Sequence, residues 1–213
     1  MQYQLTVPAS EFLDAIKKAD QFICKDTFYD ELCHIALELH KPNDKLYVIG
    51  ANQYTMYTKM IKLSSEDNKL PNKSETNYGC ILLSSNNVKN IISLCKNVLR
   101  IQNLAIKFLF VPREKENGYY DSMAYIDESM EYKFESKFIS YPDMHVFEKE
   151  FKEEDQANCM FDINPKYLAS VGKIFNKDTY VHITKNKDAT LIRFENKLNS
   201  GEYVIAAAMR NVE

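Results

Sequence analysis

The sequence QLTVPASEFLDAIKKA at residues 4–19 returns in altered form as CILLSSNNVKNIISLC at residues 80–95 and as MFDINPKYLASVGKIF at residues 160–175. The three segments can be aligned on one apolar residue each, and these origins are Leu5, Ile81 and Phe161. Two positions after its origin each segment has another apolar residue, which is the spacing of a strand. Seven positions after its origin each segment has a further apolar residue, and from there the apolar residues follow the spacing of a helix. The chain therefore contains three related units that each begin with a strand and continue into a helix.

Each predicted helix is preceded by residues that favour helix starts, namely Pro8 with Ser10, Ser84 with Ser85, and Asn164 with Pro165. After each helix come alternating apolar runs that predict strands: 33–40, 45–52 and 54–63 in the first unit, 104–111, 121–127 and 131–140 in the second, and 179–186, 189–196 and 202–209 in the third. Turn-forming residues separate these runs, for example Glu116-Asn117-Gly118. We therefore expect an α+β protein of repeated β-α-β-β-β units with antiparallel sheets and helices on one side.

Two polar segments divide the units. SSEDNKLPNKSETN at 64–77 separates the first unit from the second, and FEKEFKEEDQ at 147–156, with five acids against two lysines, separates the second from the third. We expect one domain of two units at 1–146, an acidic linker at 147–156, and a third unit, or half domain, at 157–213.

Composition points to a globular protein with no general affinity for polyanions. Hydrophobic residues make up 45% of the 213 residues, enough for a sizeable core, and the net charge is −3. The five cysteines are widely spaced within apolar runs, which indicates reduced thiols. The beginning of the sequence lacks a basic region followed by an apolar one, and no long apolar run follows later. We expect a cytoplasmic protein without a membrane span.

Four stretches resemble the bacterial DNA polymerase III beta subunit, the DNA sliding clamp family. They are LTVPASEFLDAIKKADQFICKDTFYDELCHIALEL at 5–39, KLYVIGANQYTMYT at 45–58, FISYPDMHVF at 138–147 and EYVIAAAMRNVE at 202–213. The first three look like the strand and helix, the turn and the Phe-Pro-Asp exit of the clamp's middle domain. The last looks like the Met-Pro-Met-Arg end of the clamp, although Ala208 stands at the proline position. Asn52-Gln53 also replaces the Asp-Gly of the clamp turn.

The resemblance implies a DNA-clamp-like fold and two binding activities. Clamps encircle duplex DNA and hold partner peptides in an apolar groove. Carried over by position, the groove residues are Ala51, Tyr54, Thr55, Met56, Val146, Ala207, Met209 and Arg210. Methionine and tyrosine suit an adaptable protein-binding surface, although core packing would also account for Met56 and Met209.

Two of the predicted helices carry lysines and no acids. On the second and third helices the basic residues recur on one face at helical spacing: Lys89, Lys96 and Arg100, then Lys166, Lys173 and Lys177. These residues are the candidates for non-specific contact with DNA phosphates, although an ordinary solvated face has the same pattern. The first helix is neutral, because Glu11, Asp14 and Asp20 offset its lysines.

No enzyme motif stands out. Cys24, Cys33, His34 and His40 lack the spacing of a metal site or a local cysteine nucleophile. Pro142-Asp143 with Glu150-Phe151-Lys152 has too short a gap for a nuclease metal site, and neither glycine-rich nucleotide motif is present. We expect a protein that binds without catalysis, with no metal and no cofactor.

The sequence thus predicts a processivity or tethering factor that binds duplex DNA non-specifically and takes polymerase or other clamp-binding peptides. The alternative is a clamp-fold interaction module that does not encircle DNA. A half domain would expose a sheet edge and an apolar helix face unless something covers them. A homo-oligomer that pairs two third units would cover both.

Overall fold

The computed structural model describes residues 2–40, 44–64, 67–72, 78–96, 104–126, 130–138, 141–143, 145–151, 163–175, 180–186, 190–196 and 201–208. For Tyr78, Lys96, His145 and Glu148 it describes the backbone alone. Every statement below concerns these residues.

Three helices start where the repeat predicts. They are α1 (Ala9–Ala19), α2 (Ser85–Lys96) and α4 (Pro165–Ile174), and each begins four residues after the origin of its unit. In α2 and α4 a side chain caps the start: Ser84 Oγ accepts from the Asn87 N–H at 3.3 Å, and Asn164 Oδ1 accepts from the Lys166 N–H at 3.0 Å. At α1 the N-cap is Pro8, and no side chain caps it.

The strands form one antiparallel sheet. In the first unit they are β1 (Tyr3–Pro8), β2 (His34–His40), β3 (Lys45–Ala51) and β4 (Thr55–Lys62), and in the second β5 (Tyr78–Ser84), β6 (Ala105–Pro112), β7 (Tyr119–Tyr125) and β8 (Glu131–Lys137). The third unit contributes β9 (Val181–Lys185), β10 (Leu191–Asn196) and β11 (Glu202–Ala207). Their order is β1-β6-β7-β8-β5-β2-β3-β4-β11-β10-β9. The expected α+β architecture with antiparallel strands is confirmed.

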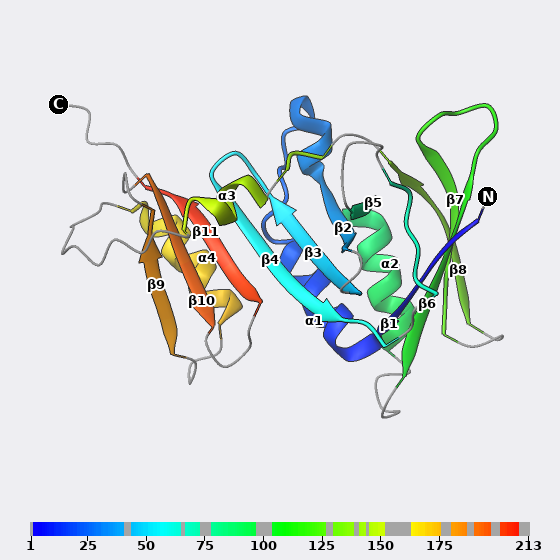
Figure 1. Ribbon diagram of the computed structural model, residues 1–213, viewed down its shortest axis with the longest axis horizontal. Coiled ribbons are helices and arrows are strands. Elements are labelled where there is room, and N and C mark those ends of the chain that lie inside the picture. Colours follow the sequence, from blue (N-terminus) through cyan, green and yellow to red (C-terminus); the bar gives the residue numbers. More distant parts are fainter. Residues whose placement is uncertain are drawn as a thin grey trace.

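The first two units exchange their opening strands. Strand β1 of the first unit pairs with β6 of the second, with Leu5 opposite Phe108, and β5 of the second unit pairs with β2 of the first, with Ile81 opposite Leu37. The third unit attaches differently, because its last strand β11 pairs with β4, with Ile205 opposite Met56. This β4–β11 seam joins the third unit to the first (Figure 1).

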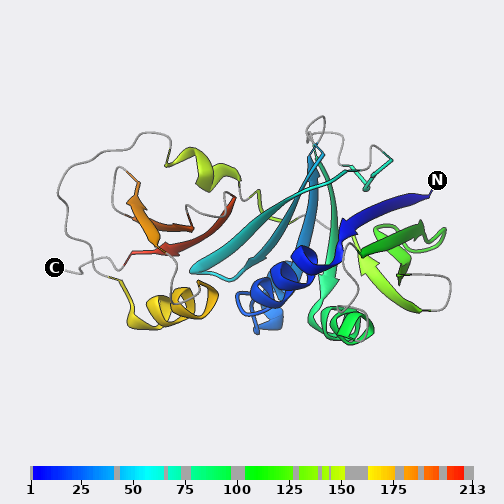
Figure 2. The ribbon, with the colours of Figure 1, turned by 90° about the horizontal axis from the view of Figure 1, so that it is seen from below.

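Each face of the sheet has its own apolar core. Helices α1, α2 and α4 lie in a row along one face, called here the helical face, while α3 (His145–Lys149) lies on the opposite side (Figure 2). The larger core lies under the helices and includes Phe12 and Phe108, whose rings meet edge to face at 5.3 Å. The smaller core lies on the opposite face, where Tyr141 and Phe151 cover the strands.

Two short elements were not expected. The 3-10 helix η1 (Thr27–Cys33) precedes β2, where Asp26 accepts from the Phe28 N–H at 3.0 Å. Helix α3 spans residues 145–149 and so crosses the predicted boundary between the domain at 1–146 and the linker at 147–156. The segment around α3 packs against the sheet through Tyr141 and Phe151, which flank the helix and are buried, whereas the acidic composition had indicated a solvated linker.

Candidate interaction sites

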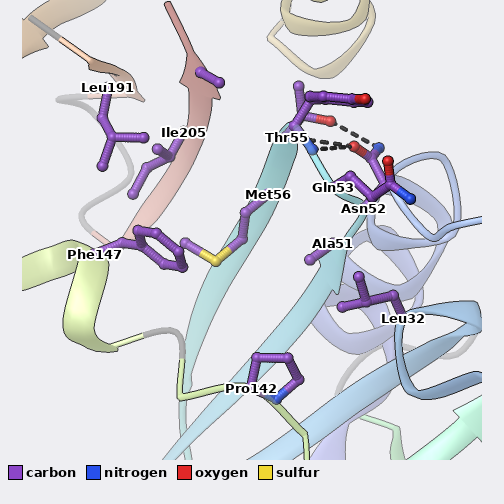
Figure 3. A pocket seen from close by; sticks show the side chains of 12 residues that line it. Leu32, Ala51, Asn52, Gln53, Thr55, Met56, Pro142, Phe147, Leu191 and Ile205 are labelled. Carbon is purple, nitrogen blue, oxygen red and sulfur yellow. Dashed lines mark hydrogen bonds between the residues drawn. The ribbon is translucent and has the colours of Figure 1, made fainter. Parts of the chain in front are cut away.

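A pocket of about 230 Å³ lies beside the β4–β11 seam. It is mostly apolar, and its walls come from η1, the β3–β4 turn, the exit segment with α3, and the third unit (Figure 3). The lining residues are Leu32, Ala51, Asn52, Gln53, Tyr54, Thr55, Met56, Pro142, Phe147, Leu191, Ile205 and Ala207. Because Met56 and Ile205 belong to the core opposite the helices, the floor of the pocket is on that face.

Asn52 holds the turn that forms one wall. Its side-chain oxygen accepts from the Tyr54 and Thr55 N–H groups at 2.9 and 3.0 Å, and its amide nitrogen donates to Thr55 Oγ1 at 2.8 Å and to the Phe22 carbonyl at 3.0 Å. Positive φ occurs at no residue of this turn. The asparagine therefore builds the turn by hydrogen bonding, in the place where the clamp turn has Asp-Gly.

The turn is also tied to the third unit. The Ala207 N–H donates to the Tyr54 carbonyl at 2.8 Å, and the Tyr54 ring, which is largely exposed, stacks with Tyr167 of α4 at 6.3 Å. The exit segment closes another wall through Phe147, whose ring points toward Met56 (Figure 3). The pocket thus depends on how the third unit sits against β4.

Five of the eight groove residues expected from the sequence line this pocket: Ala51, Tyr54, Thr55, Met56 and Ala207. Val146 does not line it and is exposed, while its neighbour Phe147 does. Met209 and Arg210 lie outside the described residues. Sequence reasoning missed Asn52 as the organiser of the turn and Leu191 and Ile205 as third-unit walls. Leu191 shares its side of β10 with Arg193 and Glu195, and β11 is apolar on both sides, so neither strand marked these positions.

A buried acid closes the seam on the helical face. Glu202 in β11 is 1% exposed, and its Oε1 accepts from Lys18 Nζ of α1 at 2.7 Å and from the Tyr57 hydroxyl of β4 at 3.0 Å. Lys18 Nζ also lies 2.8 Å from the Asp14 carboxylate. One carboxylate of the third unit is therefore bound by two groups of the first, which fixes the register of β11 on β4.

The pKa values of this cluster favour the paired state. Burial lowers the pKa of Lys18, but the hydrogen bonds and charges of Asp14 and Glu202 raise it above its ordinary value overall. Burial and the nearby Glu202 charge raise the pKa of Tyr57 far above its ordinary value, so its hydroxyl keeps its proton and donates.

The candidate DNA-binding residues are described in part. Lys89, Lys166 and Lys173 are exposed on α2 and α4, which lie on the same face of the sheet (Figure 2). For Lys96 only the backbone is described, and Arg100 and Lys177 lie outside the described residues. Helix α1 lies between α2 and α4 on this face and carries exposed acids, Glu11 and Asp14, beside its lysines.

Neither a metal site nor a membrane-spanning helix is found among the described residues. In that part of the chain no three His, Cys, Asp or Glu side chains are placed to hold a metal ion. The helices described there are too short or too polar to cross a bilayer.

Solved structures of bacterial clamps share this fold. The beta subunit of DNA polymerase III from Thermotoga maritima superposes with a TM-score of 0.65 at 15% identity, covering 98% of this chain and 65% of that one. The corresponding subunit from Borrelia burgdorferi, in complex with a natural product, gives 0.69 at 10% identity over 98% and 63%. The sliding clamp of Pseudomonas aeruginosa bound to griselimycin gives 0.60 at 9% identity over 100% and 66%.

These likenesses establish the fold. No protein-family model matches the sequence, and no curated protein matches it. The chain spans just under two thirds of the length of the structures named above. It therefore has the fold of the DNA polymerase III beta subunits, as the sequence resemblance predicted, at a shorter length.

Proposed function

We propose that this protein is a tethering factor of the sliding-clamp type, which holds duplex DNA against its helical face and a partner peptide in the seam pocket. The observation that carries the proposal is the row of α1, α2 and α4 on one face of a continuous sheet, with Lys89, Lys166 and Lys173 exposed there. Helices α2 and α4 contain no acid. A face of this kind suits the phosphate backbone, which is read without sequence specificity.

The seam pocket suits a short peptide with apolar side chains. Its floor of Met56 and Ile205 is apolar, and Gln53 adds a polar side chain to the lining. Pockets with apolar walls and few oriented polar groups are typical of such recognition. Because the floor lies on the face opposite the helices, a peptide there and DNA on the helical face would not compete for space.

A second candidate is a clamp-fold interaction module that does not encircle DNA. The neutral charge of α1, in the middle of the helical row, favours it, since exposed Glu11 and Asp14 would face the phosphates. Both candidates act by binding, without catalysis and without a cofactor. We propose a cytoplasmic protein working as a homo-oligomer, with polymerase or other clamp-binding peptides as partners.

A charge-reversal experiment separates the two candidates. Lys89→Glu, Lys166→Glu and Lys173→Glu together should weaken binding to duplex DNA strongly, and three lost phosphate contacts should flatten the plot of log affinity against log salt by about 3 units of slope. The matched control is Lys107→Glu with Lys115→Glu and Lys133→Glu, three exposed lysines, two of which lie on strands and point away from the helical face. Equal loss in both triple variants, or no binding by the wild type, favours the interaction module.

The peptide site is tested by filling it. Ala207→Trp would place an indole in the pocket, and we expect it to weaken binding of fluorescent peptides with paired leucine and phenylalanine side chains by more than about tenfold. Val111→Trp is the control, because Val111 is an exposed residue of β6. Equal affinity of the wild type and the Ala207→Trp variant would show that the peptides bind elsewhere.

A further inference from the structure

We propose that Cys24 and Cys33 are a site of reversible oxidation, where a disulfide forms and fixes the η1 segment beside the seam pocket. Cys24 lies shortly before η1, and Cys33 is the last residue of η1. Leu32, directly before Cys33, lines the pocket. The inference goes beyond the proposed function, because the bond forms whether or not a peptide or DNA is bound.

The backbone holds the two cysteines close together. The Cys24 N–H donates to the Leu32 carbonyl at 2.8 Å, so the chain has returned to Cys24 by the time it reaches Cys33. Cys33 Sγ donates to the Asp26 carbonyl at 3.3 Å, which directs this thiol back toward the start of the segment. A disulfide requires two cysteines that are neighbours in space, and this pair meets that requirement.

The two thiols are close enough to interact. Burial raises the pKa of Cys33, and the Cys24 thiol raises it further by its charge and by a side-chain hydrogen bond. The charges of Asp30 and Asp26 act in the same direction. Both thiols are free in this structure, so they form a reduced pair that is positioned to be joined.

Solvent reaches this pair. Cys24 and Cys33 are partly exposed, whereas Cys80 and Cys95 are buried at 6% and 1% exposure. A thiol is oxidised only where an oxidant can approach it. Of the described thiols, Cys24 and Cys33 are therefore the ones open to oxidation.

The oxidant that suits the pair is a low-molecular-weight disulfide. The Cys24 thiolate attacks one of its sulfurs, forms a mixed disulfide and releases the first small thiol. Cys33 then loses its proton to water, attacks the Cys24 sulfur and displaces the second small thiol. The two cysteines are oxidised to one disulfide while the small disulfide is reduced to two thiols, and excess small thiol reverses both steps. Cys24 attacks first, because the Cys33 thiol is held protonated against the Asp26 carbonyl.

The bond would restrict a segment that is otherwise weakly held. No residue of η1 is fully buried, although Leu32 packs against the smaller core, and Phe28 is 83% exposed. Asp26 holds the start of η1 through hydrogen bonds from the Phe28 and Tyr29 N–H groups at 3.0 and 3.1 Å. Segments with few buried contacts open locally at low cost, and a disulfide across residues 24–33 limits that opening. Oxidation would thereby fix the wall of the pocket that Leu32 supplies.

Peptide mapping of the full chain by mass spectrometry tests the bond. After incubation with oxidised glutathione, we expect a Cys24–Cys33 disulfide that dithiothreitol removes. Cys33→Ser should leave Cys24 as a mixed disulfide with glutathione, because the second displacement has no thiol. Cys159→Ser is the matched control, since it removes a different cysteine and should leave the Cys24–Cys33 bond unchanged. Absence of the bond at every glutathione ratio, or a bond from either cysteine to another one, overturns the proposal.

Chymotrypsin tests the restriction of η1. Cleavage after the exposed Phe28 should be at least about threefold slower in the oxidised chain than in the reduced chain, because the closed loop cannot extend into the protease. In Cys33→Ser the rate should be the same before and after oxidation. A disulfide that leaves the cleavage rate unchanged overturns the fixing of η1. Neither readout uses a peptide or DNA, so both remain valid if the tethering function fails.

Discussion

Replacing Lys18 by methionine would remove one of two lysines near the buried Glu202 carboxylate, the other being Lys59, which lies opposite Glu202 in the β4–β11 ladder. Glu202 is 1% exposed and receives the ammonium of Lys18 at 2.7 Å, while methionine keeps most of the apolar contact of the lysine side chain. Removing one partner of a buried ion pair costs about 3–5 kcal/mol, because the remaining charge is uncompensated. The Lys18 side chain is 19% exposed, Tyr57 still donates to Glu202, and the charge of Lys59 remains nearby, so we expect a smaller loss of about 2 kcal/mol.

Urea denaturation, followed by circular dichroism and tyrosine fluorescence, measures this loss. The neighbouring Lys17→Met is the control, because Lys17 is exposed on α1, and its loss should cost less than about 0.5 kcal/mol. In a double variant, Lys18→Met with Glu202→Gln, the amide removes the unpaired charge and still accepts from Tyr57. We expect the double variant to recover most of the stability.

The pH dependence gives a second readout. The pKa of Lys18 is raised in the folded state, so its contribution is fully present below the unfolded value of about 10.4 and is lost as pH rises through the folded value. The stability difference between wild type and Lys18→Met should therefore shrink only above about pH 10. A cost for Lys18→Met equal to that of Lys17→Met, or a double variant no more stable than the single one, would refute the assignment.

Three further predictions concern single residues. Gly50→Ala should destabilise the chain by about 2–3 kcal/mol in urea denaturation, because a β-carbon there would clash with the Ala19 carbonyl, and a loss below about 0.5 kcal/mol would mean that α1 moves aside freely. Asn52→Asp should loosen the pocket turn, since a carboxylate would face the Phe22 carbonyl, and proteolysis at that turn should accelerate; unchanged cleavage would contradict the role of the amide. Burial raises the pKa of Cys95 to about 11, so the β-carbon chemical shift of Cys95 in the folded protein should show no titration below about pH 10, and a midpoint near pH 9 would contradict the burial of the thiol.

The repeated units were predictable because their helices and strands bury one face each, and burial imposes a period on the sequence. Phe12, Val88 and Leu168 marked the three helices correctly. Helix α3 was not predicted, because the acidic residues around Phe147 and Phe151 outweigh these two aromatic residues when hydropathy is averaged over neighbouring positions. Phe151 is buried against the opposite face of the sheet, a long-range contact that local sequence does not reveal.

The β4–β11 seam could not be predicted from the sequence. Nothing local to Glu202 distinguishes it from an ordinary exposed acid at the start of a strand, and its partner Lys18 lies 184 positions away. The attachment of β11 to β4 is likewise a long-range choice between sheet edges. The resemblance located five of the twelve residues that line the pocket, but it could not identify Asn52 as the residue that makes the turn.

The central claim, that this fold tethers the protein to DNA, is tested most directly by retention on circular duplex DNA. Protein assembled on nicked circles should survive a moderate-salt wash and be released when a restriction enzyme linearises the circle, as expected for a ring that encloses the duplex. Equal loss from circular and linear DNA would contradict enclosure, and the chain would then be an interaction module with a clamp fold.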